Sequence, residues 1–258
     1  MLEKGNYSYP QGEPFLGGSN VADHPSTLPL KSWNHFGGMT VERSPLFSGI
    51  LPEDYARISA GARIKAFARD QMLHFEGDTV EQVILLTSGF VKLTQFGSGG
   101  AEVILRIGMP GDVLGAMGLF SGGKQRSTAQ TLQTCRALVW NAQAFKTLVE
   151  HFPVLHKNMV RILGKHLLEL EERFREVATE RVGPRVARQL VRLLEQIGPP
   201  ESGEIEIGLS REELGQMTGT TLFTVSRLLS SWEARGIVRN RRKGVTICDV
   251  RQLRAESE

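Results

Sequence analysis

The clearest hydrophobic pattern in the chain predicts two short helices joined by a tight turn in its C-terminal third. Ser210 is followed three residues later by Glu213, which is the capping-box pattern that begins a helix. Leu214 and Met217 give this first helix one apolar face. Gly219 follows and supplies the turn residue. Two short helices with a Gly-containing turn between them are typical of a helix-turn-helix.

The second helix of this pair has a polar start and an apolar interior. Thr221 can cap its first turn, and Gly236 is placed to end it. Its apolar positions are Leu222, Val225, Leu228, Leu229 and Trp232. The side chains expected to face away from its own core are Leu222, Phe223, Ser226 and Arg227. An ordinary antiparallel helix pair is the alternative interpretation.

The basic segment after these helices favours the helix-turn-helix. Its five cationic residues are Arg235, Arg239, Arg241, Arg242 and Lys243. Two short strands, 237–239 and 245–248, would form a wing with a basic turn between them. A charge run by itself is usually a solvated face, but beside a helix-turn-helix it favours contact with phosphates.

A long amphipathic helix precedes this region, over residues 154–179. Its apolar residues are spaced by four, three, four and three, as in the seam of a coiled coil. They are Leu163, Leu167, Leu170, Phe174 and Val177. A helix packed only on its own domain is the alternative, and we expect parallel dimerisation instead. A hinge follows at residues 182–185, and Pro184 fits the first turn of a further helix that ends at Ile197.

Short alternating runs between residues 63 and 140 predict an antiparallel sandwich or barrel. The expected strands are 64–67, 72–75, 83–86, 90–93, 103–106, 130–133 and 137–140. A short helical segment over 44–62, with Leu51 on its apolar side, precedes them, and residues 1–40 are expected to form a flexible arm.

Composition narrows the function further. The 258 residues carry a net charge of +3 with a pI near 9.0, which is compatible with nucleic acid binding. Cys135 and Cys248 lie far apart in predicted strands, so we expect neither a disulfide nor a metal site. The sequence contains no membrane-length apolar run and no signal peptide, so a cytoplasmic protein is expected. It also contains none of the common catalytic motifs, which argues against an enzyme.

Several motifs occur in the order found in one known family. They are FEGD at 75–78, LTSG at 86–89, PGDVLG at 110–115, GLF at 118–120, RSTA at 126–129, VGPRVA at 182–187 and TVSRLL at 224–229. Over roughly residues 45–250 the chain resembles the Crp-Fnr superfamily of bacterial transcription regulators. The resemblance implies an α+β fold: a sensory antiparallel β-roll of the cyclic-nucleotide-binding jelly-roll type over 41–150, a dimerisation helix over 151–181 and a winged helix-turn-helix over 182–258. It also implies a homodimer on a palindromic operator, with RNA polymerase as a further partner.

The resemblance assigns the DNA contacts to the second helix and the wing. Arg227 matches a family position that reaches a base edge, and arginine binds guanine in bidentate fashion. Many relatives carry a glutamate where this chain has Phe223, which could instead pack on a thymine methyl group. We therefore expect an unusual half-site. The full expected set is Ser210, Thr220, Thr221, Leu222, Phe223, Thr224, Ser226, Arg227, Arg241, Arg242 and Lys243.

The resemblance also suggests an effector pocket. Arg126 and Ser127 match the phosphate-binding positions of the cyclic-nucleotide branch, and we expect Arg126 to be partly buried against an anion or a carboxylate. The family's ribose-binding glutamate is here Ala116, and its base-contacting pair on the long helix falls at Leu170 and Glu171. The expected pocket residues are Gly115, Ala116, Met117, Arg126, Ser127, Thr128, Leu170 and Glu171.

The identity of the signal stays open at this point. Loss of those polar contacts argues against cyclic AMP, and the lack of cysteines in residues 1–62 argues against an iron–sulfur cluster. Haem remains open because several histidines and methionines are present. We expect a DNA-binding regulator, either activator or repressor, that is controlled by a small-molecule, redox or gas signal. The alternatives are a regulatory module whose winged domain contacts a protein, and a haem-based gas sensor of the same fold.

Overall fold

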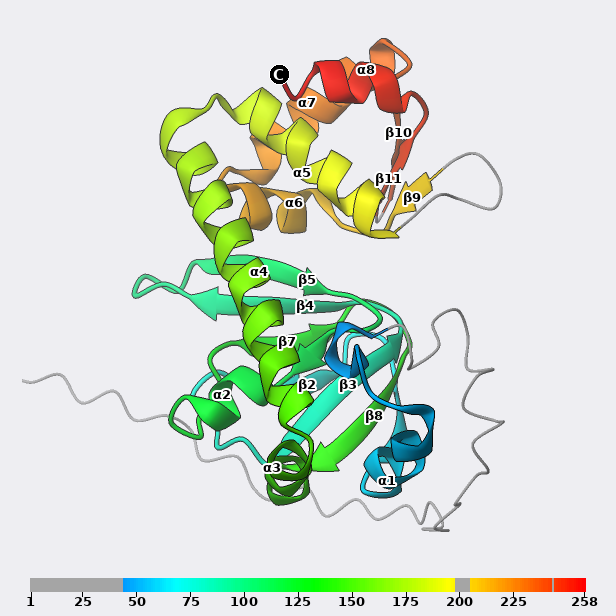
Figure 1. The fold of residues 1–258 in the computed structure, drawn as a ribbon. Helices are drawn as coiled ribbons and strands as arrows, with labels where there is room; N and C mark the ends of the chain where they lie inside the picture. The colour runs from blue at the N-terminus through cyan, green and yellow to red at the C-terminus, as the bar shows by residue number, and fades with distance from the viewer. Residues whose placement is uncertain (1–43, 198–204, 243) are drawn as a thin grey trace, which may run out of the picture.

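The computed structural model describes residues 44–197, 205–242 and 244–258. It contains a β-roll, a long helix that leaves it, and a C-terminal helical domain above the roll (Figure 1). The expected α+β architecture is therefore confirmed. The predicted arm over residues 1–40 and the wing residue Lys243 lie outside the described residues.

Two four-stranded antiparallel sheets form the β-roll, with strand orders β1-β8-β3-β6 and β2-β7-β4-β5. The strands are β1 (Arg63–Phe67), β2 (Met72–His74), β3 (Gln82–Ser88), β4 (Val91–Phe96), β5 (Glu102–Gly108), β6 (Val113–Leu114), β7 (Thr128–Thr131) and β8 (Cys135–Asn141). The seven predicted strands are all present. The two-residue β6 and the short helix α2 (Ala116–Phe120) after it were not predicted, because both are too short to show a period.

The segment before the roll and the helix after it close one end of its core. The 3₁₀ turns η3 (Pro45–Phe47) and η4 (Pro52–Asp54), helix α1 (Tyr55–Ala60) and helix α3 (Ala142–His151) form this region. Trp140 and Phe145 are fully buried there, and Trp140 Nε1 donates to the Ile58 carbonyl at 3.1 Å. Leu51, expected on the apolar side, is instead 57% exposed, because it lies between the two 3₁₀ turns and not in a continuous helix.

The first turns of helix α4 (Pro153–Thr179) pack on the roll. Leu155 and Met159 are buried there. The side-chain amide of buried Asn158 donates to the backbone carbonyls of Leu46 at 2.8 Å and Ser48 at 2.7 Å. Beyond this anchor α4 rises along one side of the roll towards the C-terminal domain (Figure 1).

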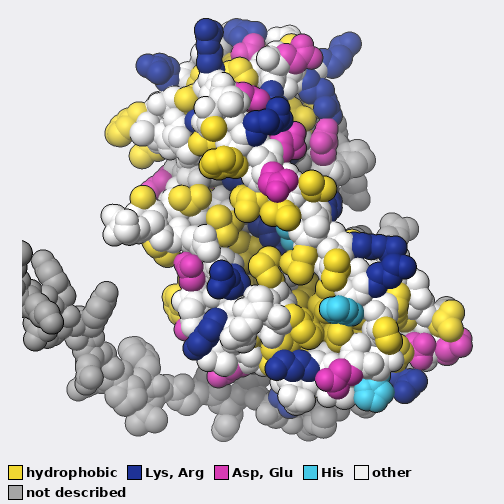
Figure 2. Space-filling view, turned by 60° about the vertical axis from the view of Figure 1, so that its left-hand side comes forward, with side chains coloured by type: hydrophobic (Ala, Val, Ile, Leu, Met, Phe, Trp, Pro, Cys, Tyr) yellow, Lys and Arg dark blue, Asp and Glu magenta, His cyan; other side chains and the backbone are white. Residues whose placement is uncertain are grey.

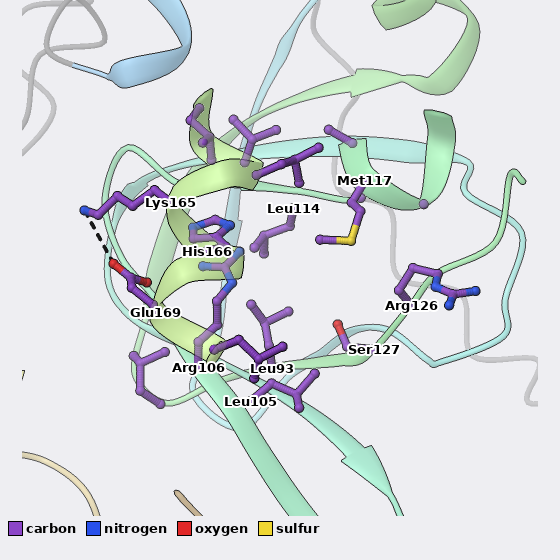
Figure 3. Close-up of a pocket in the computed structure, with 18 of the residues that line it drawn as sticks. Leu93, Leu105, Arg106, Leu114, Met117, Arg126, Ser127, Lys165, His166 and Glu169 are labelled. Atoms are coloured by element: carbon purple, nitrogen blue, oxygen red, sulfur yellow. Dashed lines mark ion pairs between the residues drawn. The ribbon is translucent and has the colours of Figure 1, made fainter. Parts of the chain in front are cut away.

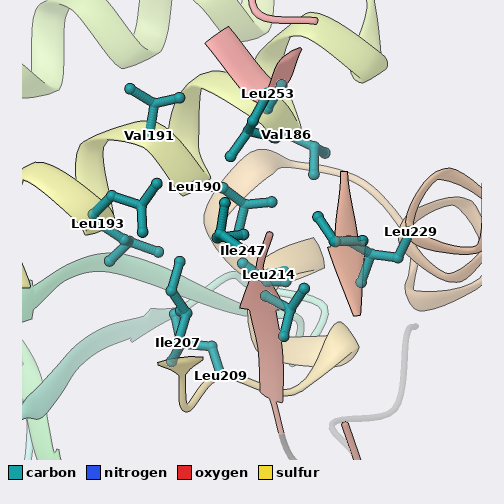
Figure 4. Close-up of a cluster of buried hydrophobic side chains, with 14 of the residues drawn as sticks. Val186, Leu190, Val191, Leu193, Ile207, Leu209, Leu214, Leu229, Ile247 and Leu253 are labelled. Carbon is teal, nitrogen blue, oxygen red and sulfur yellow. The ribbon is translucent and has the colours of Figure 1, made fainter. Parts of the chain in front are cut away.

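The C-terminal domain is a winged helix-turn-helix with its own core. Its elements are α5 (Val182–Ile197), β9 (Ile205–Ile207), α6 (Arg211–Thr218), α7 (Leu222–Ala234), β10 (Val238–Arg241), β11 (Gly244–Ile247) and α8 (Val250–Ala255). Its sheet has the order β10-β11-β9. Leu190, Leu214, Leu229 and Ile247 meet in one buried cluster (Figure 4). Helix α8 was not predicted, and Cys248 lies just after β11 and not within a strand.

The C-terminal domain packs directly on the β-roll of the same chain, with α6 against β5 (Figure 1). Ile104 and Ile107 of β5 are buried within the same apolar cluster as the helical domain. Beside them, Gln216 Nε2 donates to Glu102 Oε2 at 3.0 Å. The hydrophobic core is therefore continuous across the domain boundary.

Two arginines hold the C-terminal end of α6. Arg173 of α4 donates to the Ile104 and Leu105 carbonyls of β5 and, at 2.7 Å, to the Met217 carbonyl of α6. Buried Arg185 of α5 donates to the next carbonyl, that of Thr218, also at 2.7 Å. The last carbonyls of a helix lack intrahelical partners and carry partial negative charge, so cations are favoured there. These bonds tie three elements to the turn of the helix-turn-helix.

Replacing Arg173 by Ala should loosen the docked domain, because it leaves three carbonyls without their donor. We expect a loss of about 1–3 kcal/mol in the free energy of unfolding, measured by urea denaturation. Arg173→Lys keeps the charge but not the planar fork of donors, so an intermediate loss is expected. Arg175→Ala is the matched control. Arg175 is 65% exposed and forms a surface ion pair with Glu172 at 3.7 Å, and such a pair contributes little to stability. Equal effects of Arg173→Ala and Arg175→Ala would contradict the assigned role.

Candidate nucleic-acid interface and effector cavity

The first helix of the helix-turn-helix begins as its sequence predicts. Ser210 Oγ accepts from the Glu213 amide at 3.1 Å, and Glu213 Oε2 accepts from the Ser210 amide at 2.8 Å. The helix ends at Gly219, whose φ of 61° is left-handed. The capping box and the glycine turn are thus confirmed, and Ser210 has a capping role within the domain.

Gly215 allows the two helices to approach closely. A Cβ atom at this position would lie 2.8 Å from the Thr220 carbonyl oxygen, which is too near for any side chain. The Thr220 amide donates back to the Gly215 carbonyl at 3.0 Å. This short contact sets the angle at which α7 leaves the turn.

The outer face of α7 is open at its N-terminal end. Thr221 Oγ1 accepts from the Thr224 amide at 3.3 Å, which confirms the predicted cap. Leu222 is 42% exposed and Phe223 is 78% exposed. Arg227 is exposed one turn further on, whereas Thr220, Thr224 and Ser226 are half-buried. Val225, Leu229 and Trp232 are buried on the opposite face.

The wing follows α7 as expected. Strands β10 and β11 pair antiparallel from Val238 opposite Ile247 to Arg241 opposite Gly244. Arg241 and Arg242 are exposed at the turn, and Arg241 Nε donates to Thr246 Oγ1 at 3.3 Å. Hydrogen bonds from Asn240 to the Glu233 carboxylate, at 2.7 and 2.6 Å, join the wing to the end of α7. They also hold the pKa of Glu233 below its usual value.

An exposed apolar stripe runs along α4, next to its packing face, and two of its members, Leu163 and Leu170, also line the cavity described below. Its predicted members are Leu163 at 37% exposure, Leu167 at 56%, Leu170 at 50%, Phe174 at 75% and Val177 at 48%. Figure 2 shows hydrophobic side chains gathered over one face of the molecule. Leu168 is also 67% exposed, but one residue along a helix turns by about 100°, so it lies outside the stripe.

A cavity of about 780 Å³ lies between α4, the β-roll and the C-terminal domain (Figure 3). Six of the eight predicted pocket residues line it: Gly115, Ala116, Met117, Arg126, Ser127 and Leu170. Thr128 and Glu171 do not. Thr128 is buried and its Oγ1 accepts from the Glu76 amide at 3.0 Å, while Glu171 lies on the exposed side of α4. The expectation for these two residues was wrong, because a motif position does not specify the direction of its side chain.

Arg126 differs from its expectation. It is exposed and not partly buried, and its side chain points away from Met117 and Leu114 (Figure 3). No hydrogen bond or ion pair joins its guanidinium to another residue in the described part of the chain. Of the two expected neighbours, an anion or a carboxylate, the described residues therefore supply no carboxylate.

Two histidines of the cavity are held neutral. Burial lowers the pKa of His166 to about 4, helped by the cationic Arg106 nearby. Burial also lowers the pKa of His74 to about 4, against the opposing effect of Asp78. Arg106 is itself paired with Asp112 at 2.8 Å. The remaining walls combine apolar side chains with charged ones, among them Lys165, Glu169, Arg173 and Arg192, so an apolar group would fit only part of the cavity.

Sequence reasoning missed His166, Arg106 and Arg173 as lining residues. A weak signal existed for two of them. His166 and Arg173 lie seven and fourteen residues after the buried Met159, so the helical period places all three on nearly one face. The helical period shows which face of α4 packs against the rest of the chain, but it does not show that a cavity lies there. Within the described residues, no helix is long and apolar enough to cross a membrane, and no group of three or more histidine, cysteine or acidic residues could hold a metal ion.

Comparison with known proteins finds family matches for both the β-roll and the winged helix-turn-helix. The family model of the cyclic nucleotide-binding domain matches residues 64–152, and that of the Crp-like helix-turn-helix domain matches residues 184–256. A CRP-like cAMP-activated global transcriptional regulator of Mycobacterium tuberculosis is 27% identical over 213 residues, covering 82% of this chain and 95% of the relative. The cyclic AMP receptor protein of Thermus thermophilus is 27% identical over 197 residues, covering 76% and 88%.

A solved structure shows the same fold. The c-di-GMP responsive global regulator CLP of Xanthomonas campestris superposes with a TM-score of 0.67 at 20% identity, over 76% of this chain and 99% of that one. The matched curated relatives are transcription regulators and not enzymes. Together with the β-roll, the long helix and the winged helix-turn-helix, these matches show that the chain belongs to the Crp-Fnr family of transcription regulators.

Proposed function

We propose that the protein is a homodimer that binds a palindromic DNA operator with its two α7 helices. The observation that carries this proposal is the exposed apolar stripe on α4, in the same chain as an open helix-turn-helix. Parallel pairing of two α4 helices would relate the two C-terminal domains by twofold symmetry. Recognition helices related in this way enter successive major grooves about 34–36 Å apart.

The spacing of the stripe supports dimerisation. Five large apolar residues at alternating spacings of four and three fit knobs-into-holes packing between two helices. Their exposure in the single chain is the kind of contiguous apolar patch that marks a protein interface. Arg173 then connects the same helix to α6, so the dimer axis and the helix-turn-helix are joined through defined hydrogen bonds.

Leu167→Lys should break the dimer, because it would bring two ammonium groups into one apolar seam. We expect the dissociation constant to rise by at least about a hundredfold, measured by sedimentation velocity over a concentration series. Leu168→Lys is the matched control, since Leu168 is similarly exposed but lies outside the stripe. Dimerisation that survives Leu167→Lys, or is lost equally in Leu168→Lys, would refute the proposed interface.

The DNA surface combines a base-reading face with phosphate contacts. The exposed Arg227 would reach a base edge, and the amides at the start of α7 would face a phosphate. Thr220, Thr221, Thr224 and Ser226 supply short hydroxyl groups around them. Arg241 and Arg242, with Lys243 beside them in the sequence, would contact the flanking backbone from the wing. RNA polymerase would then be a partner at the bound operator.

Arg227→Ala and the double change of Arg241 and Arg242 to Ala should affect DNA binding differently. We expect Arg227→Ala to lose operator selectivity, by about 1–3 kcal/mol per half-site, while fold and dimer persist. The wing variant should weaken all duplexes alike and reduce the slope of log K against log salt by about one unit for each phosphate contact removed. Fluorescence anisotropy with operator and unrelated duplexes over a salt series distinguishes the two.

The controls of this titration also test the alternative function. Unchanged operator selectivity in Arg227→Ala would refute its role. Absence of binding to any duplex at low salt, or affinity that does not depend on salt, would exclude DNA binding and favour a protein partner for the winged domain.

We further propose that the cavity holds the effector and that this effector is not cyclic AMP. The two relatives above are described as responding to cyclic AMP, but Ala116 and Leu170 offer no hydrogen bonds where a polar ligand would need them. Arg126 faces away from the apolar walls. A ligand with a large apolar part suits the apolar share of these walls better. Haem is the second candidate, because His74 and His166 both line the cavity and imidazole is a common metal ligand.

A ligand bound in this cavity would contact the DNA-binding domain directly. Arg173, Gln189 and Met217 line the cavity together with residues of the β-roll. A ligand that contacts both sides would have different affinities for the docked and undocked arrangements, and that difference is what shifts a conformational equilibrium.

Cyclic AMP at about 1 mM should leave the melting temperature of this protein unchanged. A ligand at a hundred times its dissociation constant would stabilise it by about 2.7 kcal/mol, which a thermal-shift measurement detects readily. The Mycobacterium tuberculosis relative is the positive control under the same conditions. A clear stabilisation by cyclic AMP would contradict the proposal, and a Soret absorbance band of the purified protein would identify haem instead.

A further inference from the structure

Two large apolar side chains are exposed side by side at the start of α7. Leu222 and Phe223 are 42% and 78% exposed, and Phe223 has the highest exposure among the large apolar residues of the described chain. No aromatic or cation–π contact among the described residues involves its ring. The domain core on the other face of α7 is complete without it, so packing within the chain does not account for this residue.

The position of Phe223 indicates what would cover it. It is the second residue of α7 and lies one turn before Arg227, so both side chains share the outer face of the helix. Long side chains in a helix lean towards its N-terminus, so the Phe223 ring is directed towards the N-terminal end of α7. Arg227, Arg241 and Arg242 are exposed in the same domain. The cationic Arg227 and the N-terminal end of α7 beside an apolar ring fit a polyanion that has apolar groups of its own.

We propose that Phe223, flanked by Leu222, reads the 5-methyl group of a thymine in each half-site of the operator. This inference rests on the proposed DNA-binding function. The thymine methyl is the apolar group that a base pair presents in the major groove, where the other base-edge positions are hydrogen-bond donors or acceptors. A phenyl ring neither donates nor accepts in the manner of those groups. Packed on guanine, adenine or cytosine it would leave their polar edges without partners, which costs free energy.

The effect of the methyl group follows from its burial. Removing one buried methyl forfeits about 0.8 kcal/mol, which is about a fourfold change in affinity for each half-site. Because the dimer would bury two such groups, loss of both should weaken binding by about fifteenfold. The same arithmetic predicts no change at thymines that the ring does not touch, so the response should be confined to one symmetric position.

Uracil substitution tests this directly. The full-length protein is used to select tight-binding duplexes from a random pool, and each thymine of the selected site is then replaced singly by deoxyuridine. This replacement removes only the methyl group. We expect about a fourfold loss at one thymine per half-site and about fifteenfold when both are replaced, measured by fluorescence anisotropy. Equal affinity for every uracil-containing duplex would overturn the proposal.

Variants of Phe223 identify the side chain responsible. Phe223→Ala should bind thymine and uracil duplexes equally, with unchanged circular dichroism because the side chain is exposed. Phe96→Ala is the matched control, since Phe96 is 57% exposed on β4, far from α7 in the sequence, and it should retain the difference. Phe223→Glu should move the preference at this position from thymine to cytosine, whose amino group a carboxylate accepts.

The outcomes separate this inference from the proposed function. Selection of no duplex, even at low salt, would contradict DNA binding itself. Selective, salt-dependent binding without a uracil effect, or a uracil effect that persists in Phe223→Ala, would retain the DNA function and refute the role of Phe223. A Phe223→Ala variant that binds DNA normally but loses a protein partner would assign the exposed ring to protein contact.

Discussion

The C-terminal end of α6 is the point on which the arrangement of the whole molecule depends. Its last carbonyls accept from Arg173 of α4 and Arg185 of α5, and Arg173 also binds two carbonyls of β5. A helix end buried without donors would be costly, so these arginines are needed wherever α6 docks on the roll. Because Gly215 holds α7 tightly to α6, the same bonds orient the recognition helix.

This arrangement places an ionic network next to the cavity. Glu176 of α4 is 2% exposed, and burial alone would raise its pKa, but the ion pairs with Arg192 and Arg188 of α5 hold that pKa below its usual value. Arg192 and Arg173 both line the cavity. The cavity and the ionic network beneath the winged helix-turn-helix therefore share residues. A carboxylate as buried as Glu176 is costly without its cationic partners, so the network stabilises the docked arrangement.

Two of the apolar surfaces that the described residues leave exposed each match one proposed partner. The stripe on α4 has the periodicity of a helix seam, which a second copy of the chain would cover. Leu222 and Phe223 interrupt an otherwise polar recognition face, which suits the apolar edge of a thymine. The basic wing carries no such information and suits the backbone of any duplex.

Local patterns were enough to predict much of this protein. These local features are the capping box at Ser210, the turn at Gly219, the cap at Thr221 and the apolar spacing on α4. Each depends on residues a few positions apart, so the sequence pattern alone predicts it. The short α2, β6 and α8 escaped prediction because they span less than two turns or a few residues.

Long-range packing decided the rest. The outward direction of Arg126, the exclusion of Thr128 and Glu171 from the cavity, and the convergence of Arg173 on two domains depend on how distant segments meet. Side-chain direction at such a junction depends on the relative placement of whole elements, and no periodicity within one segment encodes that placement.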